Sequence, residues 1–238
     1  MYDDLAIDYD RKRKKPWKDL YSFLNFLKSK NFNFKGICVD LGCGNGRNIP
    51  LFLNQESSVI GIDNSLEFLR IIKSNILNKK LDSQRVNLIL ADIRYIPLRL
   101  CVIDNMFAIA SIHHVKYSKE RMKVIKNVNI TLKAGGYFLL TVWRKYQRKY
   151  RKHFIKERIL RIFSFSYRKK FKEANLKEFG DILVPWKISN KNIEIKRFYH
   201  FFSKYELKSL LRDFKILLIK KFGGPNKKDN FFTLVKKI

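Results

Sequence analysis

Apolar and polar positions along the chain fall into blocks that predict strands and helices in turn. Short apolar runs typical of buried parallel strands cover 36–42, 57–63, 85–92, 102–111 and 137–143. Segments with apolar residues at helical spacing cover 16–30, 46–55, 64–77 and 118–133. Because strands that alternate with helices form parallel sheets, this order predicts an α/β fold with a Rossmann-like, doubly wound sheet.

Turn and capping residues sharpen these boundaries. Pro50 must lie in the first turn of its helix, Asn64 or Ser65 should cap the helix that follows, and the run 134–136 should stop the helix over 118–133. A helix over 203–214 precedes two strands, 215–223 and 229–238. We expect these strands to form an antiparallel hairpin on the sheet edge, which makes the sheet seven-stranded and mostly parallel. The chain reads as one domain, 1–238, with an insertion at about 144–185.

Composition excludes several classes of protein. The chain has 238 residues, 46% of them hydrophobic, and can bury a core, but no apolar run approaches the ~20 residues of a membrane span. The N-terminus has no apolar signal-peptide core. Cys38, Cys43 and Cys101 show no CxxC spacing, which argues against a disulfide framework or a zinc site. We expect a soluble, cytoplasmic protein that binds no membrane and no metal.

Charge points to a polyanionic partner. Lys and Arg number 51 against 21 Asp and Glu, a formal net charge of +30. Part of this excess reflects a general Lys-rich bias, but the segment 144–170 concentrates basic residues and interleaves them with Tyr and Phe. Cations suit phosphates and aromatic faces suit bases, so this segment predicts RNA contact. The alternative is a solvated amphipathic helix whose aromatic residues pack on the core.

A glycine-rich turn follows the first strand. Its spacing is Gly42-x-Gly44-x-Gly46 rather than GxGxxG, and Asp40 precedes it by two residues. Glycines after a strand let backbone N–H groups approach a ligand closely. A carboxylate here repels a pyrophosphate but not a cofactor with a sulfonium and an amino-acid tail.

Two further carboxylates end the next strands. Asp63 stands where a ribose-binding carboxylate belongs, and Asp92 could hold an adenine amino group. The three acidic groups favour S-adenosylmethionine over NAD. The other residues that we assign to the cofactor are Asn45, Asn64 and Ile93, in the same turns as these glycines and carboxylates, and Ala110 near the end of the fourth strand.

The segments "VDLGCGNGRN", "ADIRYIPLR", "AIASIHHV" and "GGYFLLTVW" resemble the class I S-adenosylmethionine-dependent methyltransferases. With "GDILVPWK", "RFYHFF" and "KKDNFFTLV", the chain is similar to the tRNA wobble-uridine carboxymethyl methyltransferase family over most of its length. The resemblance implies methylation of the carboxylate of 5-carboxymethyluridine, at the wobble position of the tRNA anticodon loop, to its methyl ester. It also implies a small zinc-binding activator protein as partner in a heterodimer, which we expect to join by strand addition at an apolar edge.

The residues fit this chemistry. A carboxylate is ionised at pH 7 and needs no general base, only a cationic clamp and alignment. Methylation of an adenine amino group usually needs an Asn/Asp-Pro-Pro-aromatic run, where this chain has "ASIHHV". Carbon-5 methylation of pyrimidines needs a cysteine nucleophile, and none is well placed. Alternatives that remain are another RNA position, a small molecule such as a quinone or lipid precursor, and a non-catalytic RNA-binding relic.

Candidate catalytic residues follow the fourth strand and precede the late helix. His114 should contact substrate, while His113 is interpreted as structural. Arg197 is the candidate carboxylate clamp because a guanidinium matches a carboxylate bidentately; a phosphate contact or a salt bridge is the alternative. The resemblance adds Tyr199 and His200 from the same segment, and Tyr9 near the methionine tail. Trp143 and Trp186 could stack on the uracil.

Overall fold

The computed structural model describes residues 2–78, 81–189 and 193–238. Seven strands form the central sheet: β1 (Gly36–Leu41), β2 (Ser57–Asp63), β3 (Val86–Leu90), β4 (Ile103–Ile109), β5 (Leu132–Trp143), β8 (Phe214–Phe222) and β9 (Asn230–Lys237). Their order is β3-β2-β1-β4-β5-β9-β8. The first five strands are mutually parallel, whereas β9 runs antiparallel to β5 and β8. The predicted α/β fold, a doubly wound sheet with an antiparallel C-terminal hairpin, is confirmed.

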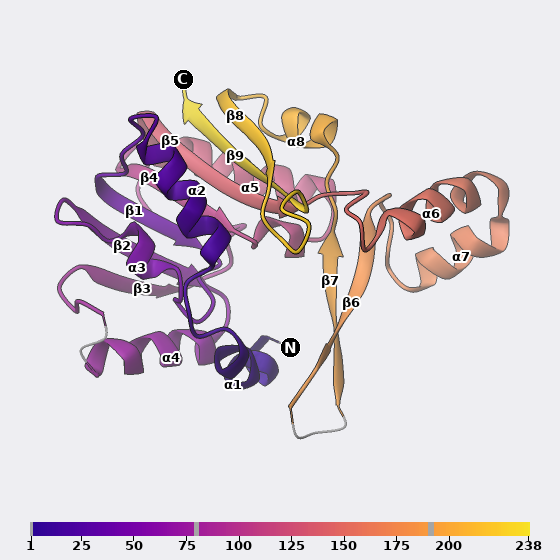
Figure 1. Cartoon of the computed structure of the whole chain (residues 1–238), viewed down its shortest axis with the longest axis horizontal. Helices are drawn as coiled ribbons and strands as arrows, with labels where there is room; N and C mark the ends of the chain where they lie inside the picture. The colour runs from indigo at the N-terminus through magenta and orange to yellow at the C-terminus, as the bar shows by residue number, and fades with distance from the viewer. Residues whose placement is uncertain (1, 79–80, 190–192) are drawn as a thin grey trace.

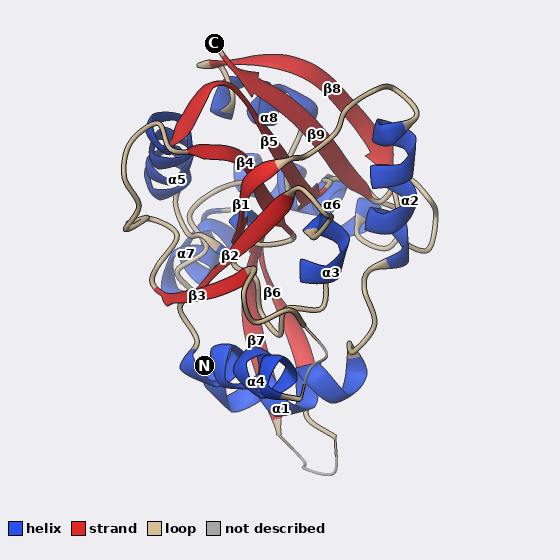
Figure 2. Cartoon of the chain, turned by 90° about the vertical axis from the view of Figure 1, so that its left-hand side faces the viewer, coloured by secondary structure: helices blue, strands red, loops and turns tan. Residues whose placement is uncertain are grey.

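Helices cover both faces of this sheet (Figures 1 and 2). The elements that do so are α2 (Lys18–Lys28), α3 (Ile49–Phe52), α4 (Leu66–Leu77), α5 (Ser118–Thr131) and α8 (Lys204–Leu210). Because side chains alternate along a strand, β1 supplies both apolar cores: Val39 and Leu41 pack with α5 and α8, and Cys38 packs with α2 and α3. The sheet is thereby held rigid from both sides.

Local signals explain most of the boundaries. Pro50 lies in the first turn of α3 as expected, although that helix has only four residues. Ser65 caps α4 by accepting a hydrogen bond from the backbone N–H of Phe68. Ser203 and Glu206 form a reciprocal capping box at the start of α8.

One strand boundary was predicted wrongly, and one helix was missed. The strand expected at 137–143 begins at Leu132, so 134–136 lie within β5 instead of in a turn. The register against β4 shifts between Ile103 and Asn105, and this irregularity accommodates the two glycines inside the strand. The helix α1 (Tyr2–Lys12) was not predicted at all. Its Leu5 and Ala6 are buried against Phe68 of α4.

The chain between β5 and α8 lies outside the main sheet. It contains α6 (Arg151–Phe163) and α7 (Phe165–Glu173), followed by β6 (Asp181–Lys187) and β7 (Glu194–His200), which form an antiparallel pair. Figure 1 shows α6 and α7 projecting to one side, while the β6–β7 pair extends toward α1. The structure thus brings the late segment 194–200 to the carboxyl ends of the parallel strands.

Among the residues placed in the structure, no helix is both long and apolar enough to cross a membrane.

Candidate active site

The three glycines in the turn after β1 have different surroundings: two are closely packed and one is open. All three glycines have positive φ, between 55° and 73°. A Cβ on Gly42 would lie 2.6 Å from the Cβ of Ser111, and one on Gly46 would lie 2.8 Å from Cγ1 of Ile72. A Cβ on Gly44 would meet no atom within 4 Å. Gly44 is therefore the glycine that faces open space, where a ligand can reach the backbone.

Asp40 is a buried carboxylate without a full set of partners. Its Oδ1 is buried and has no hydrogen-bond partner among the residues described. Burial, together with the negative charge of Asp63, raises the pKa of Asp40 to about 7. An unpaired buried carboxylate suits a ligand that brings a positive charge or hydrogen-bond donors. This observation fits S-adenosylmethionine, whose ammonium and sulfonium are both cationic.

The carboxylates at the ends of β2 and β3 are engaged differently. Asp63 accepts hydrogen bonds from the N–H of Gly44 (2.8 Å) and of Ser65 (3.0 Å), which fixes its orientation beside the glycine turn. Asn64, the next residue in the chain, is exposed. The half-buried Asp92 is held by the guanidinium of Arg94 at 2.6–3.0 Å. The two carboxylates line the same sheet edge, as predicted, followed by half-buried Ile93.

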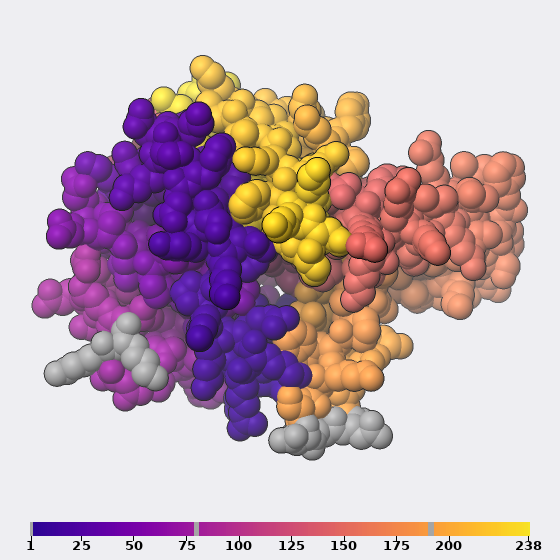
Figure 3. Space-filling view, in the orientation of Figure 1, coloured from indigo at the N-terminus to yellow at the C-terminus, as the bar shows by residue number. Residues whose placement is uncertain are grey.

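The N-terminal helix lies over the glycine turn. Asn45 donates hydrogen bonds from Nδ2 to Oδ1 of Asp10 (2.8 Å) and to the carbonyl of Arg13 (3.0 Å). Asn45 therefore fastens the N-terminal segment, a role that the sequence did not indicate. Tyr9 packs on Phe68 and stacks on Trp186, with ring centroids 5.5 Å apart in both pairs. Figure 3 shows a small hollow where the N-terminal segment, the β8–β9 turn and the β6–β7 pair meet.

The turn after β4 is strained and carries the two histidines. Ala110 has φ 56°, the left-handed region, and its N–H donates to Oγ1 of Thr141 at 2.9 Å. His113 and His114 follow in a 3₁₀ turn (Ile112–His114). His114 donates from Nδ1 to the carbonyl of Phe198 (2.9 Å), which leaves Nε2 as an acceptor. Burial lowers the pKa of His114 to about 4, so the ring is neutral at pH 7.

Aromatic rings from α1 and β7 lie beside His114. Its ring centroid lies 4.3 Å from that of Tyr199 and 5.7 Å from that of Tyr2. The ring of Trp143 lies 4.5 Å from that of Tyr199, and buried His113 stacks on the same tyrosine. Burial raises the pKa of Tyr2 to about 12. Tyr2 was not predicted as a site residue, although residues 2, 5, 6 and 9 have the apolar spacing of a helix and could have revealed it.

Arg197 is a buried cation without a carboxylate partner. Its guanidinium carbon lies 4.6 Å from the ring centroid of Trp186 and 5.2 Å from that of Tyr199. Across residues 2–78, 81–189 and 193–238 its side chain makes no ion pair or hydrogen bond, and its Nε is buried and unpartnered. The salt-bridge alternative raised from the sequence is therefore not observed.

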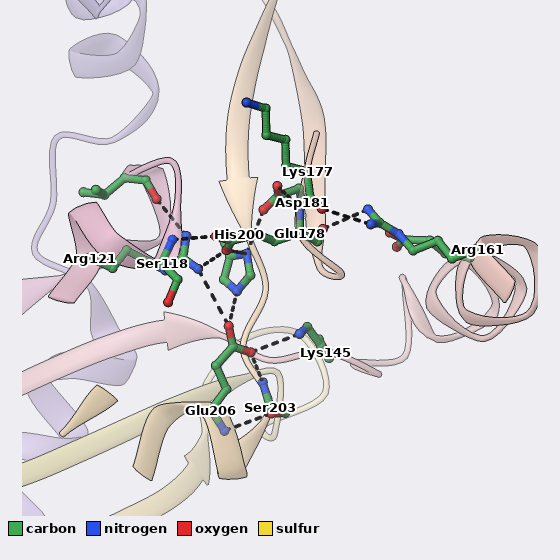
Figure 4. A network of polar contacts seen from close by, with 12 residues as sticks. Ser118, Arg121, Lys145, Arg161, Lys177, Glu178, Asp181, His200, Ser203 and Glu206 are labelled. Carbon is green, nitrogen blue, oxygen red and sulfur yellow. Dashed lines mark hydrogen bonds and ion pairs between the residues drawn. The ribbon is translucent and has the colours of Figure 1, made fainter. Parts of the chain in front are cut away.

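His200 lies outside this group of residues. Side chains alternate along β7, so His200 points away from the face that carries Arg197 and Tyr199. Figure 4 shows its ring between two carboxylates, with Nδ1 2.7 Å from Asp181 and Nε2 2.5 Å from Glu206. His200 therefore belongs to an ion-pair network and does not share a face with Arg197 and Tyr199, whereas a catalytic role for it stays a prediction.

The network around His200 joins the insertion to the sheet domain. Buried Arg121 of α5 contacts Glu178 and lies 3.8 Å from Glu206 of α8, while Lys145 lies 3.0 Å from the same glutamate. Arg161 of α6 donates to the carbonyls of Lys177 and Glu178. Although burial opposes it, the hydrogen bond and charge of His200 hold the pKa of Glu206 down to about 2. These ion pairs fix the base of β7, and with it the position of Arg197.

Comparisons with known proteins agree with this geometry. A family model described as a methyltransferase domain matches residues 39–140. The tRNA (carboxymethyluridine(34)-5-O)-methyltransferase of Schizosaccharomyces pombe is 26% identical over 216 residues, 89% of this chain and 84% of that protein. The enzyme of that name in Mus musculus, ALKBH8, is 27% identical over 60% of this chain, which spans only 19% of the mouse protein. A solved S-adenosylmethionine-dependent methyltransferase from Methanosarcina mazei superposes with a TM-score of 0.67 at 20% identity, covering 89% of this chain and 97% of that one.

Proposed function

We propose that this protein, a class I S-adenosylmethionine-dependent methyltransferase, methylates the carboxylate of 5-carboxymethyluridine at the wobble position of tRNA. The observation that carries the proposal is Arg197, a buried guanidinium with no acidic partner in the described chain. Burying a cation costs free energy of desolvation unless an anionic group pairs with it, and here a ligand can supply that group. The names of the relatives described above support a carboxylate on tRNA as that ligand.

Arg197 is suited to hold a carboxylate rather than to activate it. A guanidinium offers parallel N–H donors that match a carboxylate bidentately. The aromatic faces of Trp186 and Tyr199 fix its plane, so little conformational freedom is lost on binding. The substrate carboxylate is ionised at neutral pH, and alignment is the main task that remains for the protein. No general base is required.

The cofactor residues fit the same mechanism. S-adenosylmethionine supplies an electrophilic methyl group on a sulfonium. Asp40 offers its unpaired oxygen to the cationic amino-acid end, and Gly44 leaves room for close backbone approach. In this proposal Asp63, which lies beside the glycine turn, binds the ribose, and Asp92, which is paired with Arg94, binds the adenine. Tyr2 and Tyr9, both on α1, add aromatic rings beside His114 and Trp186.

His114 and Tyr199 complete the substrate side. The neutral ring of His114 presents the Nε2 lone pair to a donor on the uracil, because its Nδ1 hydrogen is used by Phe198. Tyr199 stays protonated, since burial raises its pKa. Both groups therefore position substrate through hydrogen bonds and ring contacts, and their charge does not change near neutral pH.

The partner in this proposal is a small zinc-binding activator. The open edges of the sheet are β3 and β8. Lysines protect β8, whereas β3 reads VNLIL, ends at exposed Leu90 and is followed by exposed Tyr95 and Leu100. We place strand addition at β3 for this reason. The cytoplasm, where such a tRNA enzyme acts, is the corresponding location.

A small carboxylic acid is the second candidate substrate, because Arg197 would bind it equally well. The experiment that separates the two measures transfer of labelled methyl to tRNA bearing carboxymethyluridine and to the same tRNA with unmodified uridine. Transfer to the first alone supports the proposal. Transfer to neither, with cofactor binding intact, favours the small molecule.

A further inference from the structure

We propose that a groove on the outer face of α6 binds the sugar–phosphate backbone of tRNA nucleotides that flank the target uridine. This inference rests on the proposed function and adds a second contact site to it. The groove has a volume of about 560 Å³ and is lined by Arg144, Tyr146, Arg151, Ile155, Arg158 and Ile159.

The two faces of α6 differ in kind. The inner face is packed: Phe154 and Glu157 are fully buried, and Glu157 pairs with Arg161 at 2.7 Å. The outer face carries residues 151, 155, 158 and 159, which recur at helical spacing. Ile155 and Ile159 on this face are 45% and 53% exposed. An open face that combines arginine with isoleucine needs an occupant with both charge and apolar surface.

Charge identifies the occupant. None of the six lining residues is acidic. Arg151 and Arg158 make no ion pair or side-chain hydrogen bond within the part of the chain that the structure describes, and both are exposed. Arg144, in contrast, is held in place because its Nε donates a hydrogen bond to the carbonyl of Lys228 at 2.9 Å. Two free guanidiniums beside a fixed one form a surface for phosphates, and the isoleucines suit ribose faces.

Two lining residues of the groove, Arg144 and Arg151, directly follow residues that pack beside the candidate active site. Arg144 directly follows Trp143, whose ring lies 4.5 Å from Tyr199 and 6.1 Å from Tyr150. An RNA strand whose target base enters beside Tyr199 therefore reaches the groove within a few nucleotides. Among the aromatic residues of the insertion, Tyr146 lines the groove, whereas Tyr150 and Phe154 pack on Phe201. The groove therefore offers one ring beside its cations and aliphatic groups.

The test is equilibrium binding of unmodified anticodon stem-loop RNA at several salt concentrations. The variant Arg151→Ala/Arg158→Ala should bind about tenfold more weakly. The slope of its log affinity against log salt should fall by about 1.4, because each phosphate that the protein no longer neutralises lowers the slope by ~0.7. The matched control is Lys119→Ala/Lys126→Ala, two exposed lysines with the same seven-residue spacing on α5. This control should leave both quantities near the wild-type values.

Unmodified RNA is used because it binds whether or not the chain methylates carboxymethyluridine. A wild-type protein that binds the stem-loop but methylates nothing would refute the proposed function and leave the groove standing. An arginine variant with wild-type affinity and salt slope would overturn the groove. Loss of the heterodimer with the activator in that variant, with RNA binding unchanged, would overturn it in favour of a protein-docking face. Arg151→Lys/Arg158→Lys should restore the salt slope.

Discussion

The guanidinium carbon of Arg197 lies 4.6 Å from the ring centroid of Trp186, and no carboxylate in the described chain pairs with it. The two residues come from adjacent strands of the β6–β7 pair, which extends toward α1 near the ends of the parallel strands. A structural arginine at such depth normally has an acidic partner, as Arg121 has in Glu178. The contrast between these two buried arginines is the basis of the functional assignment.

Replacement of Arg197 should separate activity from stability. Arg197→Met should lower kcat/KM for tRNA by roughly 10–100-fold, the equivalent of about 1.5–3 kcal/mol for a hydrogen bond to a charged group. Its Tm should be unchanged or higher, because an unpaired buried charge is removed. Arg197→Lys keeps the charge but loses the bidentate fork, and should recover only part of the activity. A fall in Tm together with activity would show that Arg197 is structural.

Asp40 should couple pH to cofactor binding. Its pKa of about 7 means that the unliganded carboxyl takes up a proton as pH falls below neutrality. Affinity for S-adenosylmethionine, measured by calorimetry, should therefore fall between pH 8 and pH 6. Asp40→Asn should bind weakly at every pH and remove this dependence. An unchanged pH profile in that variant would mean that another group is responsible.

The same residue should make the unliganded protein less stable at high pH. A carboxyl with a raised pKa binds more protons in the folded state, so stability falls as pH rises from about 4 to about 7. At pH 8 Asp40→Asn should raise the Tm of the unliganded protein by at least about 2–4 °C, the shift that 1 kcal/mol produces in a chain of this size. A lower Tm at pH 8 would contradict the burial argument.

Gly44 and Gly46 should respond differently to alanine. Both have positive φ, which costs a residue with a Cβ about 1–2 kcal/mol. At Gly46 the new methyl would also lie 2.8 Å from Ile72, so Gly46→Ala should be the less stable of the two. At Gly44 the methyl enters open space, so Gly44→Ala should fold but bind the cofactor more weakly. Thermal melts measure the stability of the two variants, and calorimetry measures their affinity for the cofactor. If both variants lost the same affinity and the same stability, the different roles of Gly44 and Gly46 would be refuted.

The sequence predicted the sheet, the glycine turn and the strand-end carboxylates, because local periodicity and turn residues encode them. It could not predict that Asn45 binds Asp10 and Arg13, since that contact depends on a helix missed at the N-terminus. Nor could it assign His200, because its two carboxylate partners come from β6 and α8. The side on which His200 lies follows only once β7 is known to be a strand.

Glu206 should make the stability of the protein depend on pH in the acid range. Because the pKa of Glu206 is held at about 2, its contribution to the free energy of unfolding is complete above the ordinary pKa range of glutamate. That contribution is lost as pH falls from about 5 to about 2. Glu206→Gln should therefore be destabilised at pH 7, with a gap from wild type that narrows toward pH 3. Glu67→Gln, which disrupts the exposed pair with Arg70, should change little at either pH. A gap that stays constant with pH would contradict the network.

The most direct measurement of the central claim is the identity of the methylated nucleoside. The protein, with and without a zinc-binding activator, is incubated with labelled S-adenosylmethionine and tRNA that carries carboxymethyluridine. The tRNA is then digested and analysed by mass spectrometry before and after mild base. We predict a new methyl ester on the wobble uridine that base removes. A methyl group that survives base would place the target on nitrogen, carbon or ribose oxygen and contradict the role of Arg197 as a carboxylate clamp.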